Sequence, residues 1–274
     1  MKISKMYLFT VTALAAVAAV QAGVILEDNF LLGSQGGTRS GGDQIVGTRV
    51  DTVATNQLWI GTGTAIKLGG TLTSDGYAQN SNTSGSGIPM AVSLPTGNLQ
   101  NEAIGGLRLT TSLRVGDSQW IAVGLWSDSS SKVDLFSENS LSIMANGNGS
   151  WSLRNDINTA AGAAHTLASG TDAYVRTDFV NVQMDWFKDS NTVDLYLNGT
   201  KVVDQLDLGT VATTTGTGFI PDIDRIGVHF LGTTVANSSA VDYVKLETIP
   251  EPATLGMVAV SSFGLLLLRR ALIK

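Results

Sequence analysis

The alternation of apolar and polar side chains over residues 107–115 constrains the fold of this chain more than any other feature. One face of the segment carries Leu107, Leu109, Thr111, Leu113 and Val115, and the other carries Arg108, Thr110, Ser112 and Arg114. A period of two residues is typical of a half-buried antiparallel strand. No segment between the two ends of the chain keeps a helical period over four turns. The sequence therefore predicts an all-β domain.

Other segments indicate further strands of the same domain. Residues 182–186 and 226–230 alternate in the same way, and 241–248 is predicted as the closing strand. The segment 120–126 is apolar on both faces, which predicts a central strand covered on both sides. We therefore expect a single antiparallel β-sandwich.

A hairpin is predicted where Asn198-Gly199 separates two apolar runs. This dipeptide supplies the two positive-φ residues of a type I′ turn. With that turn, Leu195 would face Val202 and Tyr196 would face Lys201 across the ladder.

The loops between these strands are rich in Gly, Ser, Thr and Asn, chiefly over residues 61–87 and 208–218. Such segments offer little apolar surface to a core, and long loops on a rigid scaffold often carry binding residues. The chain has no cysteine, which excludes disulfides, thiol catalysis and thiolate metal sites, so a hydrophobic core must stabilise the domain. A net charge of −6 argues against nucleic acid and anionic lipid as partners.

The N-terminus has the pattern of a secretory signal peptide. Lys2 and Lys5 precede an apolar core over residues 7–20, and small residues lead to a cleavage site between Ala22 and Gly23. We expect signal peptidase to remove residues 1–22, leaving a β-sandwich domain over 23–249.

The C-terminus carries a second processing pattern. Pro250-Glu251-Pro252 keeps the backbone extended and precedes an apolar, helix-compatible run over 253–268, which Arg269-Arg270 ends. The run is shorter than the roughly 20 residues of a full membrane span, which suits a transient anchor. The positive-inside rule would keep the arginines in the cytoplasm and the Pro-Glu-Pro step outside.

This arrangement over residues 250–274 resembles the PEP-CTERM sorting signal of Gram-negative bacteria. The resemblance implies that an exosortase, a membrane cysteine protease, recognises the tripeptide and removes the tail. It implies an inner-membrane-anchored intermediate that is delivered to the cell surface, outer envelope or extracellular matrix. A plain tail anchor with a proline linker is the alternative interpretation.

The order of segments in the domain also resembles a known fold. The matching segments are Glu27–Phe30, the strand 107–115, Val180–Asp185, Asp194–Val202 with its Leu-Tyr-Leu-Asn-Gly hairpin, and Ile223–Gly227. This layout is similar to the concanavalin A-like, laminin-G-type jelly roll. The resemblance implies glycan or protein binding, often with calcium, although a fold does not determine a function.

Catalytic residues are not evident in the pattern. Hydrolysis of a glycosidic bond needs a pair of carboxyl groups close together. The glutamates of the domain, Glu27, Glu102, Glu138 and Glu247, are spread along the chain, without the Glu-x-Asp-x-x-Glu pattern of a strand-borne pair. His165 lies in a small-residue loop and His229 alternates outward on its strand. The sequence therefore predicts a non-catalytic protein.

Two kinds of side chain are candidates for binding. Trp59 and Trp151 lie beside Gly/Ser/Asn-rich loops and are predicted as exposed platforms for sugar rings, whereas Trp120, Trp126 and Trp186 are predicted in the core. Asp222 and Asp224 share one side of an extended segment, and Asp128 follows a strand end, so these three are the candidate calcium ligands. No other cofactor is expected.

The leading hypothesis is an exported surface or matrix protein that binds glycan or exopolysaccharide without catalysis. A structural envelope component with no discrete ligand is the second hypothesis. A polysaccharide hydrolase or lyase is the third.

Overall fold

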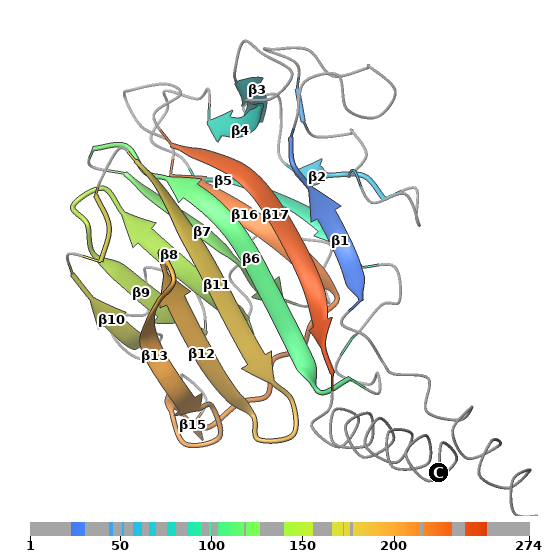
Figure 1. Cartoon of the computed structure of the whole chain (residues 1–274), viewed down its shortest axis with the longest axis vertical. Helices are drawn as coiled ribbons and strands as arrows, with labels where there is room; N and C mark the ends of the chain where they lie inside the picture. Colours follow the sequence, from blue (N-terminus) through green and yellow to red (C-terminus); the bar gives the residue numbers. More distant parts are fainter. Residues whose placement is uncertain are drawn as a thin grey trace, which may run out of the picture.

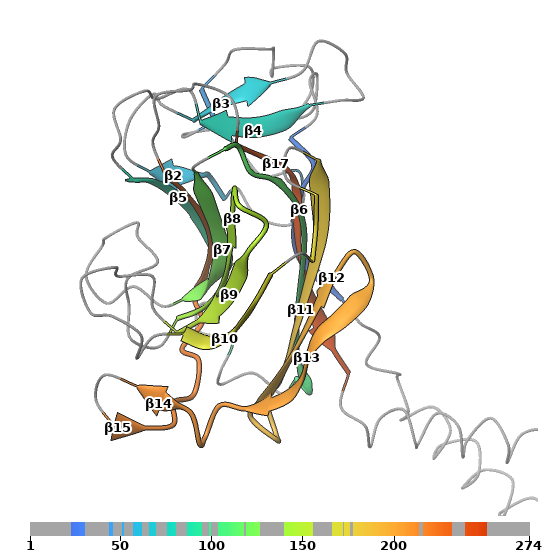
Figure 2. The same cartoon turned by 90° about the vertical axis from the view of Figure 1, so that its left-hand side faces the viewer.

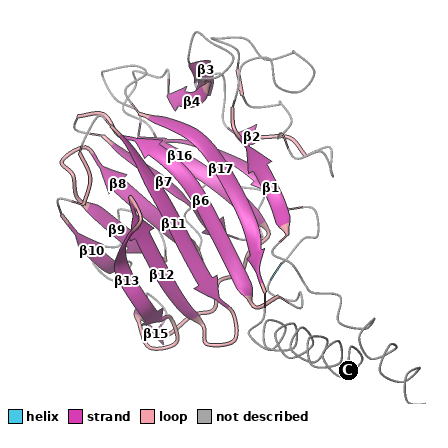
Figure 3. Cartoon of the chain, in the orientation of Figure 1, coloured by secondary structure: helices cyan, strands magenta, loops and turns pink. Residues whose placement is uncertain are grey.

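The computed structural model describes residues 23–30, 44–45, 51, 57–61, 66–69, 76–80, 87–94, 99, 104–117, 119–126, 140–155, 166–171, 173–175, 178–213, 216–231 and 239–250. Within these ranges all the regular structure is β, apart from a single 3₁₀ residue at Leu99 (Figures 1 and 3). No helix of the described ranges is long and apolar enough to cross a membrane, and the helix predicted over 253–268 lies outside them. The all-β prediction is confirmed.

Eight strands form the first sheet, in the order β13-β12-β11-β6-β17-β4-β3, with β1 also paired to β17. Their bounds are β1 Val24–Asp28, β3 Ile66–Gly69, β4 Tyr77–Asn80, β6 Gly106–Arg114, β11 Phe179–Phe187, β12 Thr192–Leu197, β13 Thr200–Asp207 and β17 Ala240–Ile249. All of these pairs are antiparallel.

Seven strands form the second sheet, in the order β10-β9-β8-β7-β16-β5-β2. Their bounds are β2 Ile60–Gly61, β5 Gly87–Ser93, β7 Trp120–Trp126, β8 Leu141–Asn146, β9 Trp151–Arg154, β10 Thr166–Gly170 and β16 Arg225–Leu231. A separate two-stranded ribbon pairs β14 (Ala212–Thr213) with β15 (Gly216–Thr217). The doubly apolar segment forms β7, the middle strand of its sheet, as predicted.

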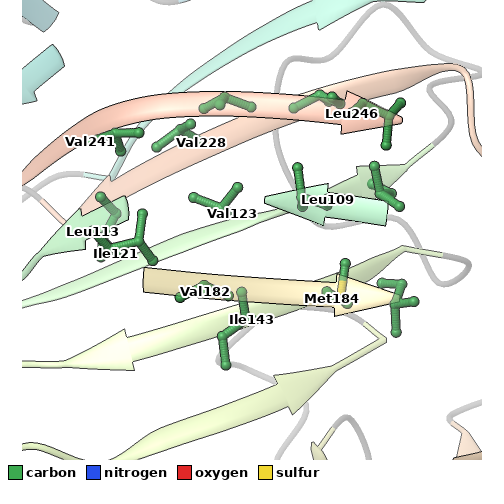
Figure 4. Close-up of a cluster of buried hydrophobic side chains, with 14 of the residues drawn as sticks. Leu109, Leu113, Ile121, Val123, Ile143, Val182, Met184, Val228, Val241 and Leu246 are labelled. Atoms are coloured by element: carbon green, nitrogen blue, oxygen red, sulfur yellow. The ribbon is translucent and has the colours of Figure 1, made fainter. Parts of the chain in front are cut away.

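The two sheets stack face to face as a sandwich, seen edge-on in Figure 2. Alternate residues of each strand point into the space between the layers, so the inner faces form one hydrophobic core (Figure 4). Leu109 and Met184 from one sheet and Val123 and Val228 from the other are fully buried there. Burial of each such side chain contributes roughly 1.5–3 kcal/mol, which gives a cysteine-free domain its stability.

The predicted hairpin is present, with two shifts of register in its ladder. Asn198 and Gly199 have positive φ values of 49° and 78°, as the type I′ turn requires. Tyr196 faces Lys201 as predicted, but Leu195 faces Val203 instead of Val202. A bulge next to this pair inserts one residue into β13, which turns Val203 toward the core.

The first and last strands lie side by side, so the two ends of the described domain meet (Figure 1). The Gly23 amide donates to Thr248 Oγ1 at 2.8 Å, and the Thr248 amide donates to the Gly23 carbonyl at 3.0 Å. Strand β1 begins at Val24 and β17 ends at Ile249. The sheet therefore spans the interval between the two predicted processing segments.

Residues 61–87 contain a hairpin that the sequence did not predict. Strands β3 and β4 pair here, and Ile66, Leu68 and Ala78 are buried in the core. The few apolar residues of this Gly-rich stretch alternate with polar ones, and that weak alternation was the available signal.

Candidate functional site

The prediction that Trp59 is an exposed platform for sugar rings is wrong, because its side chain is fully buried. Its indole Nε1 donates to Asp28 Oδ2 at 2.6 Å, and its ring packs against Phe30 with centroids 5.6 Å apart. The indole thus closes the core beside β1 and offers no face to a ligand.

The prediction that Trp151 is an exposed platform is also wrong, because only 6% of its surface is exposed. Trp151 pairs with Ala145 and Gly170 on the neighbouring strands, and its ring lies across Gly170, where a Cβ would come within 2.8 Å of Nε1. Trp151 and Leu153 alternate with Ser152 and Arg154, so the period of two already indicated an inward side chain.

The candidate calcium ligands are not assembled into a site in the described part of the chain. Asp222 and Asp224 do flank the buried Ile223, as predicted, but no group of three or more His, Cys, Asp or Glu side chains suited to a metal occurs among the described residues. Asp224 lies 3.5 Å from the Arg225 guanidinium. Asp128 lies outside the described residues. Calcium binding stays a prediction.

The processing residues fall largely outside the described ranges. Pro250 follows β17 directly and is partly exposed. Glu251, Pro252, Arg269 and Arg270 are outside, as is Ala22, whereas Gly23 is described at the start of the domain. Cleavage at either end stays a prediction.

The outer face of the seven-stranded sheet carries an unexpected group of aromatic and polar side chains. Trp120, Ala122, Gly124 and Trp126 occupy the outer positions of β7, because Ile121, Val123 and Leu125 point into the core. The neighbouring outer positions of β8 and β16 are Ser142, Met144, Asn146, Gly227 and His229. We name this surface the β7 face.

Trp120 is the partly exposed aromatic residue of the β7 face. Its ring lies 5.1 Å from the His229 ring, and it pairs with Asn146 on β8. His229 points outward from its strand, as predicted, but it is almost fully buried because it lies between Trp120 and Gly87. Burial lowers the pKa of His229 to about 4, so the imidazole is neutral at pH 7.

Trp126 lies flat against the sheet farther along the β7 face. A Cβ on Gly227 would come within 1.5 Å of Trp126 Cη2, so the glycine leaves the space that the indole occupies. Trp126 Nε1, Ser142 Oγ and Ser152 Oγ are buried on this face with no hydrogen-bond partner among the described residues. Buried polar groups of this kind normally bind ordered water or a ligand.

The sequence did not predict the β7 face as a binding surface, because the segment 120–126 is apolar on both sides and was predicted to be buried. Trp120 and Trp126 share one parity on a segment that is apolar on both sides, and that pattern does not say which side faces the second sheet. The signal that was available is the pair of glycines, Gly124 and Gly227, which flatten the outer side of two adjacent strands.

No protein-family model matches the chain, and no curated protein matches it in sequence. Among solved structures, the chain is similar to an endo-1,3-β-glucanase from Streptomyces sioyaensis, with a TM-score of 0.54 and 11% identity over 84% of this chain and 98% of that chain. It is less similar to the exoplasmic/lumenal domain of VIP36 in a Ca²⁺/mannose-bound form, with a TM-score of 0.42 and 12% identity over 74% of this chain and 88% of that chain. For the carbohydrate recognition domain of Emp46p in a potassium-bound form, the TM-score is 0.44 and the identity 12%, over 77% of this chain and 98% of that chain.

At these identities the likeness is one of fold. The two-sheet antiparallel sandwich and the likeness to the glucanase confirm the predicted jelly roll.

Proposed function

We propose that this protein is an exported surface or matrix protein whose sandwich binds glycan on the β7 face, without catalysis. The observation that carries the proposal is the position of Trp120, a partly exposed indole on a rigid strand. An indole face stacks well against the apolar C–H face of a sugar ring.

Neighbouring groups supply the polar contacts that such a site needs. Asn146 is partly exposed directly opposite Trp120; its side-chain nitrogen donates to the Ser150 carbonyl at 3.3 Å, and its amide oxygen can accept from a sugar hydroxyl. The neutral His229 ring contacts the indole, with the two ring centres 5.1 Å apart. Because Trp120 and Asn146 belong to paired strands, they keep their relative positions without a ligand.

The likeness to a glucanase supports a polysaccharide as ligand. That protein acts on a 1,3-β-glucan, so a β-1,3-glucan is a reasonable first probe for this chain.

Binding without hydrolysis is proposed because of the composition of the face. None of the seven strands of this sheet contains an aspartate or glutamate. A glycosidase requires two carboxyl groups beside the scissile bond, one of them as a general acid.

Affinity electrophoresis of the purified full-length protein through gels containing laminarin, a β-1,3-glucan, tests the proposal. We expect retardation that Trp120→Ala reduces and Trp120→Phe preserves, because phenylalanine keeps an aromatic face. Parallel gels with mannan and xylan extend the test to other neutral polysaccharides. A chelator in one set of gels tests whether calcium contributes.

Unretarded migration in all three gels would favour a structural matrix component with no discrete ligand. Retardation that Trp120→Ala leaves unchanged would show that the β7 face is not the site. Release of reducing sugar from the same polysaccharides would instead support the hydrolase hypothesis.

We also propose that signal peptidase cleaves after Ala22 and that an exosortase removes the tail near Pro250-Glu251-Pro252. The position of these steps directly outside β1 and β17 supports this order of events, because both cuts would spare the sheet. Intact-mass measurement of the mature protein from its native host tests it. A mature protein that retains Arg269-Arg270, and does so whether or not the exosortase gene is present, contradicts the sorting proposal.

A further inference from the structure

A hollow lies on the outer face of the eight-stranded sheet, opposite the β7 face. It has a volume of about 340 Å³ and is lined by Thr110, Asn181, Val182, Gln183, Tyr196 and Gly199. This volume is at the lower end of the range for small-molecule sites. We name it the Tyr196 hollow.

The floor of the hollow is a row of residues in direct register across three strands, β6, β11 and β12. Gln183 on β11 pairs with Thr110 on β6 on one side and with Tyr196 on β12 on the other. Tyr196 in turn pairs with Lys201 on β13. Neighbouring strands lie about 4.8 Å apart, so Thr110 and Tyr196 stand about 10 Å apart with Gln183 between them. Gly199 carries no side chain, which keeps one edge low.

Ion pairs next to the row hold its side chains in place. Arg108 makes two hydrogen bonds to Asp185, at 2.8 and 2.7 Å, and Gln183 Nε2 donates to Asp185 Oδ2 at 3.0 Å. On the far side, Lys201 Nζ lies 2.9 Å from Asp194 Oδ2 and 5.3 Å from the centre of the Tyr196 ring. Contact with a cation of this kind helps to fix the ring.

The carboxylates beside the hollow are therefore engaged with cations, and the groups that line it are neutral. The Thr110 hydroxyl and the Asn181 side-chain amide make no hydrogen bond within the described part of the chain. The Gln183 amide is oriented through its nitrogen. A hydroxyl, two amides and an aromatic ring match a ligand with many hydroxyl groups, and the neighbouring cations Arg108 and Lys201 are already paired with Asp185 and Asp194.

We propose that the Tyr196 hollow is a second glycan-binding site, specific for a neutral sugar unit, on the face opposite the β7 face. The ring of Tyr196 stacks on the sugar while Thr110, Asn181 and Gln183 hydrogen-bond its hydroxyls. Together with the proposed function, on which this last step rests, it makes the sandwich bivalent. One molecule then joins two polysaccharide chains, which is a direct way for a non-catalytic protein to organise a matrix.

Isothermal titration of the full-length protein with laminarihexaose, mannohexaose and xylohexaose tests the proposal. For the sugar that binds, we expect two sites per protein. Tyr196→Ala and, separately, Gln183→Ala should weaken one of them at least tenfold and leave the other intact. Trp120→Ala should do the reverse. Tyr196→Phe should keep both sites, since the ring is retained.

Tyr77→Ala is the matched control. Tyr77 is a partly exposed tyrosine on β4 of the same sheet that contacts Arg114 and Phe179 and does not line the hollow. Both sites should persist in this variant. Loss of a site in Tyr77→Ala would mean that Tyr196→Ala acts through the sheet in general, which contradicts the proposal.

The outcomes separate the two sites. A single site that Trp120→Ala removes, and that Tyr196→Ala and Gln183→Ala leave unchanged, overturns the second site and keeps the proposed function. A single site with the opposite response keeps the Tyr196 hollow and overturns the β7 face. No binding of any of the three sugars contradicts both.

Bivalence has its own measurement. Beads coated with the polysaccharide that corresponds to the bound sugar should capture the same polysaccharide, fluorescently labelled and soluble, when the full-length protein is added. Trp120→Ala and Tyr196→Ala should each abolish this bridging while the protein itself still adheres to the beads. Bridging that survives both single variants contradicts the proposal that one molecule carries a glycan site on each of its two outer faces.

Discussion

Acidification from pH 7 to pH 4 should destabilise the fold through His229. The imidazole is buried between Trp120 on β7 and Gly87 on β5, with only 2% of the residue exposed. Loss of solvation on burial lowers its pKa from 6.5 to about 4. Protonation in the folded state would therefore place a cation in a buried site.

The direction and size follow from the two pKa values. The folded pKa lies below the unfolded one, so the unfolded chain binds more protons between pH 6.5 and pH 4. The stabilisation is complete above pH 6.5 and is lost as the pH falls toward the folded value of about 4. A difference of this size corresponds to about 3 kcal/mol of unfolding free energy.

Urea denaturation of the wild type and of His229→Gln, at several pH values from 7 to 4, measures this contribution. Glutamine is polar and does not titrate, so groups other than His229 cancel in the comparison. The wild type should lose about 3 kcal/mol more than the variant between pH 7 and pH 4. Parallel pH profiles for the two proteins would refute the assignment, whatever their absolute stabilities.

The remaining predictions concern stability at pH 7, each measured by the midpoint of chemical denaturation. Gly227→Ala should cost about 1–3 kcal/mol or more, since its Cβ would overlap Trp126, and the cost should shrink in a Trp126→Leu background. Gly199→Ala should cost about 1 kcal/mol through backbone strain alone, because its φ is 78° and no atom lies within 4 Å of the new Cβ. Asp185→Ala should cost about 1–3 kcal/mol because it removes both hydrogen bonds from Arg108; an unchanged midpoint would show that this ion pair adds nothing.

Much of the fold could be predicted because strand periodicity is a local property. The alternation over 107–115 placed Leu109 in the core and Arg108 outside, and the Asn198-Gly199 dipeptide placed the hairpin. The register error at Val203 had no local signal, because a bulge changes the pairing of one residue without changing the composition of the strand. The weakly apolar hairpin of β3 and β4 was missed for a similar reason, since its burial depends on contact with distant β17.

The candidate binding residues were much less predictable. Trp59 and Trp151 were expected to be exposed because they lie next to polar loops, yet exposure depends on which elements pack over a side chain. Trp59 packs against Phe30 and donates a hydrogen bond to Asp28, a residue 31 positions away in the chain. Likewise, the Tyr196 hollow joins residues from β6, β11 and β12 that only the sheet brings together.

By itself the sequence determined the β class, the positions of most long strands and the turn between β12 and β13, because each depends on neighbours within a few residues. The tertiary structure alone decided which tryptophan reaches the surface, that His229 is buried, and that Thr110, Gln183 and Tyr196 form one row. These features depend on the order in which strands pair and on which face of each strand meets the other sheet. That order is a property of long-range packing, which local periodicity does not encode.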